Sequence, residues 1–170
     1  VWNDTLARAS RNFAVSGLST IAASPVASDG VVYATGVGSR TVALNLKTGA
    51  RMWDIPFGSA HTPAVAGNAV FLVDLDDNLV ALDRKNGEVL WSTHLPVTKT
   101  KKKRTHWAGP VLAGGSLWLV SNEGGMVGVE PTSGRVTSTR DGNEPAMISP
   151  IAVSGKLLVL SASGNLSAYE

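Results

Sequence analysis

Residues 81–91 read "ALDRKNGEVLW", and a near copy, "ALNLKTGARMW", occupies residues 43–53. Both stretches place a small residue, an Asp or Asn, a glycine and a tryptophan at the same offsets. The members of this motif are Ala43, Asn45, Gly49 and Trp53 in the first copy, and Ala81, Asp83, Gly87 and Trp91 in the second. The glycine follows a polar turn, which favours a hairpin with positive φ at the glycine. Each copy of the motif therefore predicts two strands joined by a tight turn.

The two copies belong to a longer repeat, which aligns on four dipeptides that end in proline. The prolines are Pro25, Pro63, Pro110 and Pro150. Each is followed by a run rich in β-branched and aromatic residues, such as "VVYAT" or "AVFLVD", and then by the motif or its remnant. A period near 40 residues, with four short strands in each unit, is typical of β-propeller blades. The sequence therefore predicts an all-β propeller built of about four four-stranded antiparallel blades.

The blade boundaries follow from the same alignment. We expect blades at about 24–61, 62–108, 109–148 and 149–170, the last one incomplete after its third strand. Residues 1–23 are expected to be the end of a preceding blade and a connecting loop, because Trp2 matches the tryptophan that ends the motif. Open end blades would leave apolar faces bare, so we expect these residues to be the C-terminal part of a longer chain. If they are the whole chain, closure with four blades or pairing of two halves are the alternatives.

The composition argues against several classes of function. The chain has 170 residues and no cysteine, so disulfides, thiol catalysis and cysteine-based metal sites are excluded. The net charge of +2 depends on one loop, which contains Lys99, Lys101, Lys102, Lys103 and Arg104. Nucleic-acid binding would require a wider basic face, so we expect no nucleic-acid partner. No run approaches the roughly 18 apolar residues of a membrane-spanning helix.

The motif has a structural interpretation and a functional alternative. The small residue suits close packing between blades, and the Asp or Asn can accept hydrogen bonds from the turn amides. The tryptophan offers a large apolar area and one N–H donor, which can fix the outer strand to a neighbouring blade. The alternative is an aromatic binding site used twice. In the third copy, "VGVEPTSGRVTS", Gly128, Glu130 and Ser138 replace the Ala, Asp and Trp.

Over about residues 24–170, the motif resembles the tryptophan-docking motif of quinoprotein-type, or PQQ-like, propeller repeats. The order of elements is most similar to the C-terminal half of the outer membrane protein assembly factor family, BamB. That resemblance implies part of an eight-bladed, noncatalytic lipoprotein at the periplasmic face of the outer membrane, with a lipid anchor outside these residues. It implies no catalytic, cofactor or metal site. The alternatives are a PQQ-dependent dehydrogenase-like enzyme and a generic noncatalytic PQQ-like binding propeller.

The same resemblance implies a protein partner, namely the barrel-assembly subunit (BamA-like), with nascent outer-membrane proteins as a further candidate. The partner-binding residues that we predict are Asp74, Asp76 and Asp77 in "VDLDDN", and Leu18 in the loop "SGLSTIAASP". A solvated acidic turn, and packing of the Leu18 loop against the propeller, are the structural alternatives. A calcium site is disfavoured because the acidic turn lacks the glycine and the distal Glu of an EF-type loop. The basic loop 99–104 is predicted either to bind an acidic partner or lipid phosphate, or to be solvated.

Three histidines complete the candidate residues. His61, His94 and His106 are widely spaced in the sequence, and we expect each beside a different loop. They do not have the spacing of a metal site.

Overall fold

The computed structural model describes residues 1–6, 23–38, 40–97, 104–141 and 144–170. These residues form four antiparallel sheets. The first sheet contains β1 (Val26–Ser28), β2 (Val31–Gly36), β3 (Arg40–Asn45) and β4 (Arg51–Ile55). The second contains β5 (Ala64–Ala66), β6 (Ala69–Val73), β7 (Asn78–Asp83) and β8 (Val89–His94). The third contains β9 (Trp107–Ala113), β10 (Ser116–Ser121), β11 (Met126–Val129) and β12 (Val136–Arg140), and the fourth contains β13 (Ile151–Val153), β14 (Lys156–Leu160) and β15 (Leu166–Tyr169).

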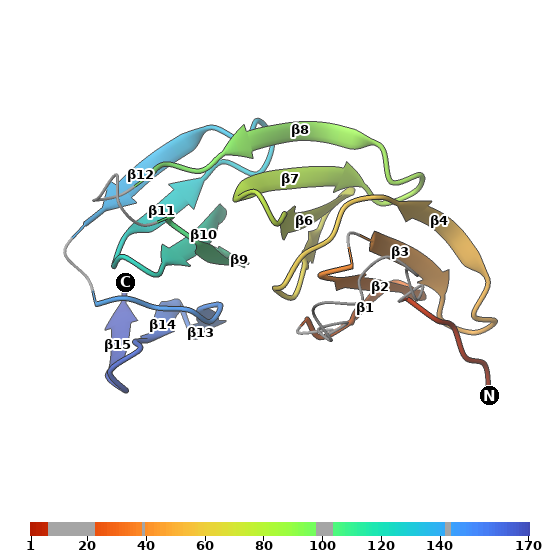
Figure 1. Ribbon diagram of the computed structural model, residues 1–170, viewed down its shortest axis with the longest axis horizontal. Coiled ribbons are helices and arrows are strands. Elements are labelled where there is room, and N and C mark those ends of the chain that lie inside the picture. Colours follow the sequence, from red (N-terminus) through yellow and green to blue (C-terminus); the bar gives the residue numbers. More distant parts are fainter. Residues whose placement is uncertain (7–22, 39, 98–103, 142–143) are drawn as a thin grey trace, which may run out of the picture.

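The four sheets follow one another around an arc, with the N-terminus at one end and the C-terminus at the other (Figure 1). In each sheet the strands run in chain order from the inside of the arc to its outside. The predicted all-β fold of four-stranded antiparallel blades is confirmed. The fourth sheet has three strands among the described residues. No helix in the described ranges has the length and apolar character needed to cross a membrane.

The core lies between neighbouring sheets rather than inside any one of them. Along β6, Val70 and Leu72 pack towards the first sheet, while Phe71 and Val73 pack towards the third. All four side chains are 2% exposed or less. A strand that is buried on both faces needs an unbroken apolar run, which explains why "AVFLV" does not alternate with polar residues.

The motif tryptophans connect one sheet to the next. The Trp53 Nε1 group donates to the Arg84 carbonyl oxygen at 2.9 Å, and that carbonyl belongs to the motif turn of the second sheet. The ring lies so close to Gly87 that a Cβ atom there would be 2.9 Å from it. Trp91 repeats this contact on the third sheet, where its Nε1 group donates to the Pro131 carbonyl oxygen at 3.0 Å. Each tryptophan is therefore docked on the glycine-containing turn of the following sheet.

Side-chain hydrogen bonds close the motif turns. The Asn45 Oδ1 atom accepts hydrogen bonds from the backbone N–H groups of Lys47 and Thr48 at 3.0 and 2.9 Å. The Asp83 Oδ1 atom accepts one from the Lys85 N–H at 2.7 Å. Short polar side chains of this kind stabilise a turn by satisfying its free amide groups.

The third sheet carries its large aromatic residue on a different strand. Gly128 lies between Trp118 and Ser138 in the register of β10, β11 and β12. A Cβ atom on Gly128 would be 3.1 Å from the Trp118 ring, so glycine makes room for an indole where the first and second sheets have Tyr33 and Phe71. Position 138, where the motif would have a tryptophan, is a serine. The described part of the fourth sheet contains no motif turn on which a tryptophan there could dock. A cleft of about 400 Å³ opens here, and Trp118, Met126 and Leu157 form part of its lining.

Candidate functional site

The predicted acidic turn and the end of the predicted basic loop meet in the structure. The Arg104 Nη2 atom lies 3.1 Å from Asp76 Oδ1, and its Nε atom lies 3.3 Å from Asp77 Oδ2. Nη2 also donates to the Leu75 carbonyl oxygen at 3.0 Å. The side chains of Arg104 and Asp76 are 56% and 82% exposed, and such an exposed ion pair contributes only about 0–1 kcal/mol. Asp76 can therefore exchange this partner for another cation at little cost.

The Asp74 carboxylate is engaged within its own turn. Its Oδ1 atom accepts hydrogen bonds from the backbone N–H groups of Asp76 and Asn78, at 2.8 and 2.9 Å. Its Oδ2 atom accepts a third from the Asn78 side-chain amide at 2.9 Å. The hydroxyl groups of Ser121 and Ser161 hold the corresponding turns of the third and fourth sheets. The contacts of Asp74 are thus those of a residue that closes a turn.

Asp77 points into the molecule and joins the second sheet to the third. It is 7% exposed and adopts a left-handed backbone conformation, with φ of 61°. Its Oδ1 atom accepts a hydrogen bond from the Trp107 backbone N–H at 3.1 Å. Its Oδ2 atom lies 3.3 Å from His106 Nδ1 as well as near Arg104. The hydrogen bond from Trp107 to Asp77 is thus made by the first residue of β9. This strand begins two residues before position 109, where the sequence repeat places the start of the third blade.

We expect Asp77→Ala to lower the free energy of unfolding by about 2–5 kcal/mol. The buried Trp107 N–H would lose its acceptor, which costs about 1–3 kcal/mol, and alanine tolerates a left-handed conformation poorly, at a further 1–2 kcal/mol. Asp77→Asn retains the Oδ1 acceptor and suits the same backbone, so we expect a loss of about 1 kcal/mol or less. Urea unfolding of both variants measures the difference. Equal losses would show that the hydrogen bond to Trp107 is unimportant.

The segment from Arg104 to Trp107 is also bonded to the turn between β10 and β11. The His106 N–H donates to Asn122 Oδ1 at 3.0 Å, and the Asn122 amide donates to the Arg104 carbonyl at 3.2 Å. The Thr105 hydroxyl donates to the Glu123 carboxylate at 3.0 Å. Two turns on adjacent sheets therefore hold this segment in place. We call the exposed surface formed by this segment and the neighbouring acidic turn the rim patch. It consists of Leu75, Asp76, Arg104 and His106.

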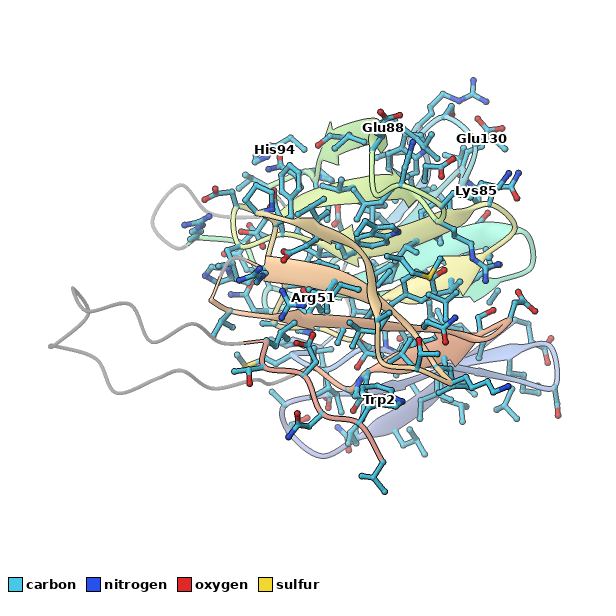
Figure 2. All side chains as sticks on the ribbon, turned by 90° about the vertical axis from the view of Figure 1, so that its right-hand side faces the viewer. Trp2, Arg51, Lys85, Glu88, His94 and Glu130 are labelled. Atoms are coloured by element: carbon cyan, nitrogen blue, oxygen red, sulfur yellow. The ribbon has the colours of Figure 1, made fainter. Side chains whose placement is uncertain are left out.

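The rim patch lies at the opposite end of the sheets from the motif turns. His94 ends β8 beside the acidic turn, and its Nδ1 atom lies 2.9 Å from Asn78 Oδ1. In Figure 2, His94 stands at one end of the molecule, whereas Lys85 and Glu130 of the motif turns stand at the other. The structure thus separates the docked tryptophans from the exposed charged turns.

The histidines are arranged differently from the expectation that each lies beside a separate loop. His94 and His106 both contact the turn that contains Asp77 and Asn78, because β8 ends and β9 begins next to it. Burial lowers the pKa of His61 below its usual value, and the charge of Asp77 partly opposes this shift. Within the described residues, no group of three or more His, Asp or Glu side chains could hold a metal ion.

Several predicted residues fall outside the described part of the chain. They are Leu18 and the lysines at 99, 101, 102 and 103. Of the predicted acidic set, Asp76 is well exposed, Asp74 is half-buried and Asp77 is buried. Arg104 and His106 were not predicted to share a site with that set. The opposite charges of the two loops were the available signal.

The comparisons with known proteins identify a family. A family model described as outer membrane protein assembly factor BamB matches residues 1–93. BamB of Escherichia coli (strain K12) is 29% identical over 167 residues, covering 98% of this chain and 41% of the relative. The quinoprotein alcohol dehydrogenase PedH of Pseudomonas putida is 34% identical over 121 residues, covering 63% of this chain and 19% of that enzyme.

A solved structure agrees with the sequence matches at the level of the fold. The crystal structure of BamB from Moraxella catarrhalis superposes with a TM-score of 0.77 at 21% identity, covering 88% of this chain and 43% of that one. This chain spans about two fifths of the length of the BamB relatives that it matches. Because the family model covers more than half of its residues, the chain belongs to the outer membrane protein assembly factor BamB family.

Proposed function

We propose that this chain is part of a noncatalytic scaffold that acts in the assembly of outer-membrane β-barrel proteins. In this proposal it works at the periplasmic face of the outer membrane and binds the barrel-assembly subunit through the rim patch. Nascent outer-membrane proteins are a second class of partner for the same scaffold. Membership of the BamB family supports the general role, since the relatives are named as assembly factors.

The observation that carries the choice of surface is the rigid display of Leu75 and Asp76. Both residues are exposed, yet their turn is held by two carboxylates. Asp74 accepts a hydrogen bond from the Asn78 N–H of the same turn, and Asp77 accepts one from the Trp107 N–H of the third sheet. A preorganised turn loses little conformational entropy when a partner binds, which favours affinity. An apolar side chain beside a carboxylate suits a basic partner surface with an apolar contact at its centre.

A binding titration with the periplasmic domains of the barrel-assembly subunit tests this proposal. We expect Asp76→Lys to weaken binding about tenfold, which corresponds to about 1.4 kcal/mol. Glu88→Lys makes the same change of charge at an exposed residue of a motif turn and should leave the affinity unchanged. Equal effects of the two variants would reject the rim patch. Absence of binding by the unaltered chain would reject the proposed partner.

A further inference from the structure

The side chain of Arg104 covers the part of the acidic turn that we assign to the partner. Its Nη2 atom contacts both the Asp76 carboxylate and the Leu75 carbonyl oxygen. Its Nε atom contacts the Asp77 carboxylate. A guanidinium group presents its donors in a fixed planar fork, which suits several acceptors on one turn. The polar groups of the turn are therefore already occupied by a cation of the chain itself.

The fold does not depend on this side chain, because other groups hold the segment from Arg104 to Trp107. The Asn122 N–H donates to the His106 carbonyl oxygen at 3.0 Å, and the His106 N–H donates to Asn122 Oδ1 at the same distance. Trp107 is buried, and its Nε1 group donates to the Pro96 carbonyl oxygen at 3.2 Å. These contacts do not involve the Arg104 guanidinium group, which can therefore turn into solvent while the backbone of the segment stays in place.

The corresponding place between the first and second sheets shows that this connection does not require an exposed charge. There the Thr41 hydroxyl donates to the Phe57 carbonyl oxygen at 2.7 Å, and the Thr35 hydroxyl accepts a hydrogen bond from the Ser59 N–H at 3.0 Å. All three hydroxyl-bearing residues are buried, so these contacts join the sheets and cannot be reached by a partner. The pair between Arg104 and Asp76 is instead exposed to solvent.

Two opposing effects decide whether a partner can replace Arg104 at the turn. The internal guanidinium group belongs to the same chain, so its effective concentration at Asp76 is high. The exposed ion pair is weak, however, and it leaves the Leu75 side chain 41% exposed. A partner that places a cation at Asp76 and an apolar group over Leu75 gains burial that Arg104 does not provide. Such a partner displaces Arg104, but it binds less tightly than it would bind an unoccupied turn.

We propose that Arg104 is an internal competitor that lowers the affinity of the rim patch for its basic partner. The competition rests on the proposed function, since it concerns the same surface. On binding, a cation of the partner takes the place of Arg104 at the Asp76 carboxylate and at the Leu75 carbonyl oxygen, and the Arg104 guanidinium group moves into solvent. Arg104 is thus the member of the rim patch that the partner displaces.

Arg104→Gln tests the competition in a binding titration with the periplasmic domains of the barrel-assembly subunit. We expect binding about threefold to fivefold tighter, because glutamine removes the charge that pairs with Asp76. Arg135→Gln is the matched control, since Arg135 is also exposed and pairs with Glu130, which stands at the other end of the molecule (Figure 2). It makes the same change of net charge and should alter the affinity by less than about twofold. Unchanged or weaker binding by Arg104→Gln would overturn the proposal, since removal of a residue that binds the partner costs affinity.

A second background separates competition at Asp76 from a general effect of charge. In a chain that carries Asp76→Asn, the guanidinium group has lost its charged partner there, so adding Arg104→Gln should change the affinity by less than about twofold. An equal gain in both backgrounds would contradict competition at Asp76. Absence of binding by the unaltered chain and by Arg104→Gln alike would reject the proposed partner, and the competition with it. Binding that Arg104→Gln does not tighten would reject the competition alone.

Discussion

Trp53→Ala is expected to lower the free energy of unfolding by about 3–5 kcal/mol, the range for removing a buried aromatic side chain. Trp53 is 7% exposed and its ring centroid lies 5.9 Å from that of Tyr33. The substitution would open a cavity between the first and second sheets and leave the Arg84 carbonyl without its indole donor. Urea unfolding, followed by circular dichroism, measures the loss.

Met52→Ala is the matched control for this substitution. Met52 is the neighbouring residue on β4, but it is 48% exposed. Its replacement should cost about 1 kcal/mol or less, because it removes little buried area. If the two variants lost similar stability, Trp53 would not be a principal contact between the sheets.

Gly87→Ala should be nearly as damaging, with an expected loss of about 2–5 kcal/mol. The residue has φ of +77°, which costs an alanine about 1–2 kcal/mol. The new methyl group would also lie 2.9 Å from the Trp53 ring, and overpacking of this kind costs a further 1–3 kcal/mol. Thermal or urea unfolding gives the total.

Gly115→Ala separates the two contributions. Gly115 has almost the same backbone conformation, with φ of +78°, but no atom lies within 4 Å of the place of its Cβ. Its substitution should therefore show the backbone cost alone, about 1–2 kcal/mol. Equal losses at Gly87 and Gly115 would mean that the Trp53 ring moves aside without measurable cost and does not hold the turn.

The repeated pattern of the sequence was enough to predict the fold class. The formation of a strand or of a glycine turn depends mainly on residues that are close in the sequence. Each copy of the repeat therefore predicts its own strands and turns. The packing of the third sheet could not be predicted in this way. Ser138 and Gly128 appear as losses in the sequence, but only the packing shows that Trp118 occupies the space next to Gly128.

The candidate site was less predictable because its contacts join distant parts of the chain. The acidic turn was visible as a cluster of charges, yet its exposed and buried members could not be distinguished. The burial of Asp77 depends on Trp107, and the pairing of Asp76 depends on Arg104, each more than 25 residues away. Contacts of this separation follow from how the second and third sheets stack, which the local pattern does not specify.

The repeated motif joins neighbouring sheets by docking a tryptophan on a glycine. The most direct measurement is the cost of Gly87→Ala in a chain that already carries Trp53→Ala. Without the ring, the remaining near neighbour of the new methyl group is Ile55 Cγ2 at 3.2 Å, the end of a side chain that can shift into the vacated space, so the cost should fall towards that of Gly115→Ala, about 1–2 kcal/mol. If Gly87→Ala costs the same with and without the tryptophan, the two residues are not coupled, and the docked ring does not join the sheets.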